Sequence, residues 1–231
     1  MRLRDLLAAF NEDLNDLNPA GTLPNRWSQA QLLRFFNEGL CNVFTLNPNE
    51  FVEASMVKLD PGTLQKLCDC KVLRKILGQT DETGLVLTPV PEQNISILSR
   101  WTKKVCLTPT NGEFTLTGYT YSAGDNGYFN VYPPIPPNED VYLKVLCANP
   151  PEPYTMKDLD KEVDAGCASV TAARQWVLYS ALMIDDEVEI AVAAARVHLE
   201  TFFNILKVQL TQQRLAELGV NRTVRATNDN G

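Results

Sequence analysis

Histidine is nearly absent from this chain of 231 residues, which contains only His198. A metal site built from several imidazoles is therefore excluded, and a serine–histidine–aspartate arrangement would have to centre on this one residue. His198 lies on a predicted helix, four residues before Phe202, and we interpret it as a residue that packs or faces a partner. The chain also lacks the GxxxxGK[ST] loop of P-loop nucleotide hydrolases. We predict no catalytic residue, no metal ligand and no cofactor.

Long apolar runs and clusters of positive charge are equally scarce. No apolar run approaches the roughly 20 residues that a membrane-spanning helix needs, and acidic residues interrupt the segment 1–18 in a way that is not typical of a signal peptide. The longest basic run is Lys103–Lys104, in a chain of net charge −7. Because proteins that grip nucleic acid usually carry a basic patch, we do not expect tight DNA binding. The lack of a long apolar run leads us to expect no membrane partner. An acidic wall that DNA slides past remains compatible with this charge.

Cysteine occurs six times, at Cys41, Cys68, Cys70, Cys106, Cys147 and Cys167. An even number is compatible with disulfides, but the chain has no signal-peptide pattern and is long enough to fold without them. We therefore expect free, buried thiols, including Cys41 on a predicted helix. Cys68-Asp69-Cys70 has too short a spacing for the usual zinc sites, and no second cysteine pair follows at a matching distance, which argues against metal binding.

The two ends of the chain carry helical patterns. The segments 1–17 and 28–46 each place apolar residues on one helical face. The second begins with a capping box, Ser28 with Gln31, and with Trp27 and Leu32 at the positions of a hydrophobic staple. Two further helices are predicted over 164–184 and 186–214, with a break at Asp185-Asp186.

The middle of the chain is instead predicted to form strands. Short apolar runs alternate with turn signals such as Asn111-Gly112. The clearest hairpin joins 114–122 to 128–132, a further strand covers 141–145, and 133–137 is too rich in proline to lie inside a sheet. The hairpin is crowded with aromatic residues, which are typical of cross-strand pairs, although a surface that stacks on bases or sugars is the alternative.

These patterns predict an α+β fold, a discontinuous helical bundle with an inserted small antiparallel β domain. The predicted divisions are 1–48 for the first half of the bundle, 49–157 for the β domain and 158–214 for the second half. The polar segment 215–231 is expected to be an extended tail that a partner orders.

Two acidic clusters precede or open the C-terminal helices, and three interpretations apply to them. One interpretation is a pair of carboxylates for hydrolysis. The one that we favour is a favourable contact with the positive N-terminus of a helix. The third depends on a family resemblance and is an acidic channel wall. The first cluster is Asp158, Asp160, Glu162 and Asp164, and the second is Asp185, Asp186, Glu187 and Glu189.

Several segments resemble the head-to-tail adaptor proteins of short-tailed bacteriophages, the tubular tail protein A-like proteins that sit under the portal. Trp27–Pro48 resembles the second helix of that family, and Tyr128–Pro134 is similar to its hairpin and exit. The segment 177–181, followed by Asp185, looks like its penultimate helix, and 195–203 resembles its last long helix. The resemblance covers about 1–210, and the region 68–80 departs from it.

The resemblance implies a virion structural protein, made in the host cytoplasm and located at the head–tail junction. Family members form a homo-oligomeric ring, a dodecamer, that binds the portal protein above and the tail nozzle below and leaves a channel for DNA. In that setting Asp185, Asp186, Glu187 and Glu189 are candidates for an acidic lumen. The tail arginines Arg214, Arg222 and Arg225 are candidates for docking on an acidic portal surface, because guanidinium groups pair well with carboxylates. Another neck or tail-tube component, such as a stopper or nozzle, is the alternative, and a small acidic hydrolase is a more distant one.

Overall fold

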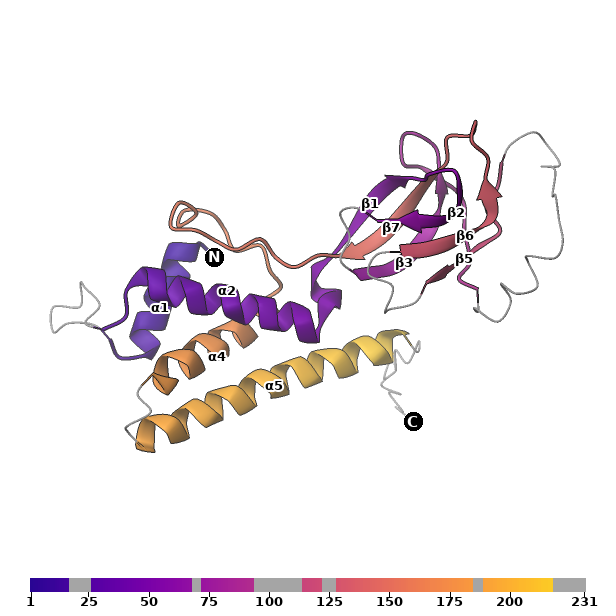
Figure 1. Ribbon diagram of the computed structural model, residues 1–231. Coiled ribbons are helices and arrows are strands. Elements are labelled where there is room, and N and C mark those ends of the chain that lie inside the picture. Colours follow the sequence, from indigo (N-terminus) through magenta and orange to yellow (C-terminus); the bar gives the residue numbers. More distant parts are fainter. Residues whose placement is uncertain (17–25, 68–71, 94–113, 122–127, 185–188, 218–231) are drawn as a thin grey trace, which may run out of the picture. The chain divides into compact units, whose positions relative to one another are not determined.

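The computed structural model describes residues 1–16, 26–67, 72–93, 114–121, 128–184 and 189–217 (Figure 1). The chain divides into two compact units, Met1–Asn47 with Glu152–Gly231 and Pro48–Pro151. The first unit is helical and the second contains two small antiparallel sheets. The predicted α+β class, with helices from both ends of the chain flanking a β region in the sequence, is confirmed.

Helix α1 (Leu3–Asp13) is shorter than predicted because the backbone turns at Asn15, whose φ of 52° lies in the left-handed region. The N–H of Asp16 then donates to the carbonyl of Asn11, and that of Asn15 to the carbonyl of Glu12, which is the Schellman arrangement for ending a helix. The Asp16 carboxylate accepts the backbone N–H of Trp27 at 2.5 Å, so it also fixes the approach to the next helix.

Helix α2 (Gln29–Leu46) has the predicted capping box, with Ser28 and Gln31 each accepting the other's backbone N–H. Its buried face carries Leu32, Phe36 and Leu40, all at most 1% exposed. Trp27 packs edge-on against Phe35, with ring centroids 6.1 Å apart. The local signals therefore set both the start of α2 and the face that it buries.

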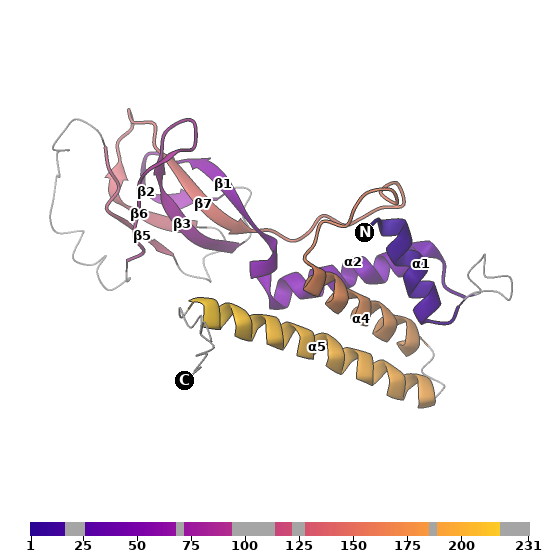
Figure 2. The same ribbon diagram turned by 180° about the vertical axis from the view of Figure 1, so that it is seen from behind.

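Helices α4 (Cys167–Met183) and α5 (Glu189–Glu217) complete the helical unit. In both views α4 lies between α2 and α5 (Figures 1 and 2). Gly39 of α2 permits a close approach to α4, and Trp176 of α4 packs against Phe202 of α5 at 5.4 Å between ring centroids. The last helix extends to Glu217, beyond the predicted end at Arg214. None of the described helices combines the length and hydropathy that a bilayer crossing needs.

The β unit begins with the 3-10 turn η1 (Pro48–Phe51) and contains two sheets. One has the order β1-β7-β3-β4 and the other the order β2-β6-β5. The strands are β1 (Val52–Lys58), β2 (Gly62–Lys66), β3 (Val72–Thr80), β4 (Val86–Thr88), β5 (Gly118–Tyr121), β6 (Tyr128–Ile135) and β7 (Tyr142–Ala148). The predicted hairpin corresponds to β5 and β6, and β5 is shorter than expected.

The prediction that 133–137 cannot lie inside a sheet is wrong for part of that segment. Strand β6 is the middle strand of its sheet and continues through Pro133 and Pro134 to Ile135. The prolines are tolerated because the pairing with β2 shifts register there, between the pairs Leu64–Asn130 and Gly62–Ile135. A missing N–H at this irregularity removes no ladder hydrogen bond that the register requires.

Aromatic residues of the hairpin do pair across strands, as predicted. Tyr121 of β5 lies opposite Phe129 of β6, and Phe129 is 1% exposed. Tyr119 is buried, and its hydroxyl accepts the N–H of Ile76 on β3 at 3.4 Å. Burial raises the pKa of Tyr119. These contacts assign the inner aromatic residues to the core of the β unit.

The cysteines differ from the expectation of buried free thiols. Cys41 and Cys167 are free but exposed. Cys147, which is buried on β7, is disulfide-bonded. The sequence argument considered the cellular compartment and could not take account of which side chains neighbour β7 in space. Cys68, Cys70 and Cys106 lie outside the described residues.

Candidate interaction surfaces

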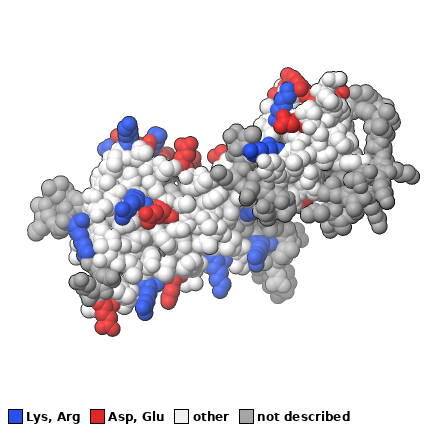
Figure 3. All heavy atoms as spheres, viewed as in Figure 1, with Lys and Arg blue, Asp and Glu red and all other residues white. Residues whose placement is uncertain are grey.

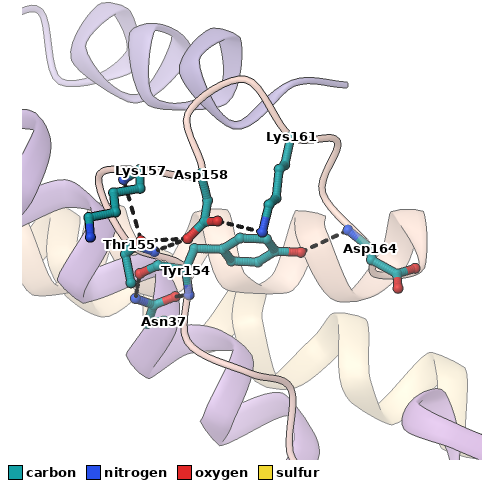
Figure 4. Close-up of polar contacts among 7 residues, drawn as sticks. All are labelled: Asn37, Tyr154, Thr155, Lys157, Asp158, Lys161 and Asp164. Atoms are coloured by element: carbon teal, nitrogen blue, oxygen red, sulfur yellow. Dashed lines mark hydrogen bonds and ion pairs between the residues drawn. The ribbon is translucent and has the colours of Figure 1, made fainter.

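The connection 152–166 lies against helices α1 and α2 through a set of polar contacts (Figure 4). The Asn37 amide accepts the N–H of Tyr154 at 3.0 Å and donates to its carbonyl at 2.9 Å. The Tyr154 ring packs on Phe36, and its hydroxyl accepts the N–H of Asp164 at 2.8 Å. One side chain of α2 therefore satisfies both backbone groups of a residue 117 positions away.

Asp158 organises the turn that follows. Its carboxylate accepts the N–H and the hydroxyl of Thr155, at 2.8 and 2.6 Å, and pairs with the Lys161 ammonium at 2.6 Å (Figure 4). Lys161 and Thr155 together hold the pKa of the Asp158 carboxyl well below its ordinary value of 3.8. The backbone of this turn also binds the start of the chain, because the N–H of Leu3 donates to the carbonyl of Lys161.

These contacts correct the helix-start interpretation of the first acidic cluster. Helix α4 begins at Cys167 and has no acidic residue in its first turn. Asp158 instead closes a turn, and Asp160 pairs with Arg4 of α1. The second cluster fits the interpretation where it is described, because Glu189 lies in the first turn of α5. Asp185, Asp186 and Glu187 lie outside the described residues.

The turn at Asp158 predicts a dependence of stability on pH. Since the folded pKa is depressed, the stabilisation is present above about pH 4 and is lost as the pH falls towards the folded value. We expect Asp158→Asn to lower the Tm at neutral pH and to flatten the fall of Tm below pH 4, measured by circular dichroism melts. Asp160→Asn is the control, with a smaller effect at neutral pH because its ion pair with Arg4 is at least half exposed. A variant of Asp158 with an unchanged pH profile would contradict this assignment.

The remaining predicted site residues lie far apart. Glu189 is exposed in the first turn of α5 and Arg214 is exposed in its last turn. The two are roughly 38 Å apart along the helix axis. The structure thus separates the acidic candidates from the one described docking candidate, while Arg222 and Arg225 lie outside the described residues.

His198 joins α5 to α4. Its Nδ1 is 2.8 Å from the Oε1 atom of Gln175, and since that oxygen can only accept, Nδ1 carries the proton in this contact. Burial lowers the pKa of His198, and the negative charge of Asp13 partly offsets this effect. These contacts support the interpretation of His198 as a packing residue.

Helix α5 exposes large apolar side chains and borders a groove. Ile190, Val197, Phe203 and Val208 are between 50% and 81% exposed. The groove has a volume of about 380 Å³. Its lining residues, all uncharged, are Ala168, Thr201, Asn204, Ile205, Val208, Gln209 and Gln212. Gln209 is only 8% exposed, and its buried Oε1 has no hydrogen-bond partner in the described part of the chain.

Charges of both signs occur on one face of the molecule (Figure 3). On the face drawn in Figure 3, Lys and Arg side chains are interspersed with Asp and Glu. Within the described ranges, no group of three His, Cys, Asp or Glu side chains could hold a metal ion. The face drawn in Figure 3 is suited to protein contacts and, among its described residues, presents no basic patch of the kind that binds nucleic acid.

The comparison with family models shows which family the chain belongs to. The model of the SU10 adaptor protein family matches residues 1–227, nearly the whole chain. The chain belongs to this family. The predicted kinship with phage head-to-tail adaptors is therefore confirmed, and the protein is a phage structural adaptor. No curated protein matches the chain.

The sequence does not reveal the roles of two polar residues of this adaptor. Asn37 is not predicted as a contact residue, because its hydrogen bonds depend on Tyr154, far away in the chain. Gln209 falls in a polar stretch, QLTQQR, that shows no sign of burial. Of the exposed apolar residues of α5, Ile190, Val197 and Val208 could have been found from their alternating spacing of four and three residues.

Proposed function

We propose that this adaptor forms a ring at the head–tail junction, docked beneath the portal protein and supporting the tail nozzle. The ring is homo-oligomeric, a dodecamer, and leaves an axial channel through which DNA passes without specific binding. The match of the SU10 adaptor family to residues 1–227 carries the proposal. Such a protein joins the portal and the nozzle in a fixed geometry, which requires no cofactor or catalytic group. The net charge of −7 supports passage of DNA without adhesion, because like charges repel.

We assign portal docking to the C-terminal end of the chain. Arg214 is exposed at the end of α5, and Arg222 and Arg225 follow it in the tail. Three guanidinium groups within a short segment suit a carboxylate-bearing surface. The tail 218–231 would then be ordered by the portal.

Electron microscopy of the full chain mixed with the portal of the same phage tests both statements. We expect a second ring stacked on the portal, and a stop after Glu217 should abolish most of the stacking while leaving α5 whole. Arg34→Ala on α2 removes an exposed arginine elsewhere and is the control. Portal rings that stay bare with the full chain would contradict direct docking and favour a stopper or nozzle position. Stacking that survives the stop would contradict the role of the tail.

The acidic lumen is the second part of the proposal. Glu189 is exposed at the opposite end of α5 from Arg214, next in sequence to Asp185, Asp186 and Glu187. A ring of such carboxylates would repel the phosphate backbone and keep DNA mobile. Charge reversal at these four positions that leaves the rate of DNA ejection unchanged would count against it.

A further inference from the structure

Helix α5 has two apolar faces. One face, with Ala195, Phe202 and Leu206, is at most 2% exposed. The other carries Ile190, Val197 and Val208, which are 81%, 60% and 56% exposed. At the angular step of an α-helix, the second face lies roughly 150° around the helix from the first. A solvated helix usually buries one stripe and presents polar residues elsewhere, so this second stripe needs an explanation.

The spacing of the second stripe is that of a helix-packing seam. Ala194, Thr201 and Asn204 fill the intervals between its apolar members, so that steps of four and three residues alternate from Ile190 to Val208. This is the a/d pattern of a coiled coil, in which each residue packs between side chains of a facing helix. The pattern predicts a helix as the occupant of the stripe.

The flank of the stripe is self-complementary in charge. Glu189, Arg196, Glu200 and Lys207 are all exposed and alternate in sign, and Figure 3 shows blue and red groups alternating along α5. In a copy running antiparallel, with the two-fold axis at Leu199, Lys207 lies two residues from the position opposite Glu189, and Glu200 lies two residues from the position opposite Arg196, within reach of these long side chains. The same register pairs Ile190 with Val208, Ala194 with Asn204 and Val197 with Thr201, so that every a position meets a d position.

We propose that the exposed stripe of α5 binds α5 of a second copy of this chain, antiparallel, in a two-fold symmetric pair. Each charge contact then occurs twice. The neutral, partly apolar seam lets two chains of net charge −7 approach each other without opposing like charges at the contact.

The pair is distinct from the proposed ring. Neighbours in a cyclic ring use two different surfaces, whereas this contact joins the same surface of both chains. The pair is therefore a state of the free protein, and it separates before or during ring formation. The pair forms before docking and does not depend on binding to the portal.

A charge-swap series on the full chain tests the pair, with sedimentation velocity at several concentrations as the readout. Arg196→Glu alone places like charges opposite each other twice and should weaken the dimer about tenfold. Arg196→Glu with Glu200→Arg should restore it, because both chains then carry both changes. Val197→Asp should give monomers. Arg34→Glu on α2, which reverses an exposed charge away from α5 and breaks the ion pair with Glu38, is the control and should leave the dimer intact.

Circular dichroism confirms that each variant is folded, as expected for substitutions at exposed positions. A wild-type chain that sediments as a monomer at every concentration would overturn the pair and leave the portal proposal standing. A dimer that the double swap fails to restore would also overturn it, because the facing residues would then not be these.

Discussion

Replacement of Phe36 by alanine should lower the free energy of unfolding of the helical unit by about 3–5 kcal/mol. Phe36 is fully buried, with ring centroids 5.8 Å from Phe10 of α1 and 6.2 Å from Tyr154. One side chain of α2 thus contacts both the first helix and the connection 152–166. The substitution leaves a cavity and removes two aromatic contacts, each of which adds to the loss of buried area.

Urea denaturation followed by far-UV circular dichroism measures this loss. Phe203→Ala is the matched control, because Phe203 is 50% exposed and its truncation should cost less than about 1 kcal/mol. The pair Phe10→Ala and Phe36→Ala should be non-additive, because the two rings are in contact. Equal effects of Phe36→Ala and Phe203→Ala would show that the core of the helical unit is not where these contacts place it.

The parts of this fold that local chemistry determines could be predicted from the sequence. The capping box at Ser28 and the apolar spacing of α2 involve neighbours along the chain, and both are present in the structure. The aromatic hairpin was also predictable, since its two strands are close in sequence. Predicted helix ends were less accurate, because the ends depend on hydrogen bonds such as that from Asp16 to Asn11.

Features that depend on distant residues could not be predicted. The acidic residues before α4 looked like a helix start, but Asp158 pairs within its turn and Asp160 with Arg4. Prolines in β6 looked incompatible with a sheet until the register shift opposite β2 was known. The role of Asn37 requires the position of Tyr154, which no pattern around Asn37 reveals.

Gly39 is a further position of this kind, and Gly39→Leu is expected to destabilise the helical unit by about 3 kcal/mol or more. A Cβ atom at Gly39 would lie 3.1 Å from the Cα and carbonyl oxygen of Ala173 and from the Cβ of Trp176. Two of these neighbours are backbone atoms of α4, which cannot rotate away. The leucine side chain would therefore force α2 and α4 apart.

Two further variants distinguish the steric effect of Gly39→Leu from a change in helix propensity. Gly39→Ala gains about 1 kcal/mol of helix propensity while it tightens the same contact, so its net effect should be small. Ala30→Leu on the exposed side of α2 adds the same bulk without a neighbour and should be nearly neutral. A Gly39→Leu variant as stable as Ala30→Leu would contradict the close approach of α2 to α4. If the approach is as close as described, the variant also removes the support that α4 gives to α5, and stacking on the portal should fail together with stability.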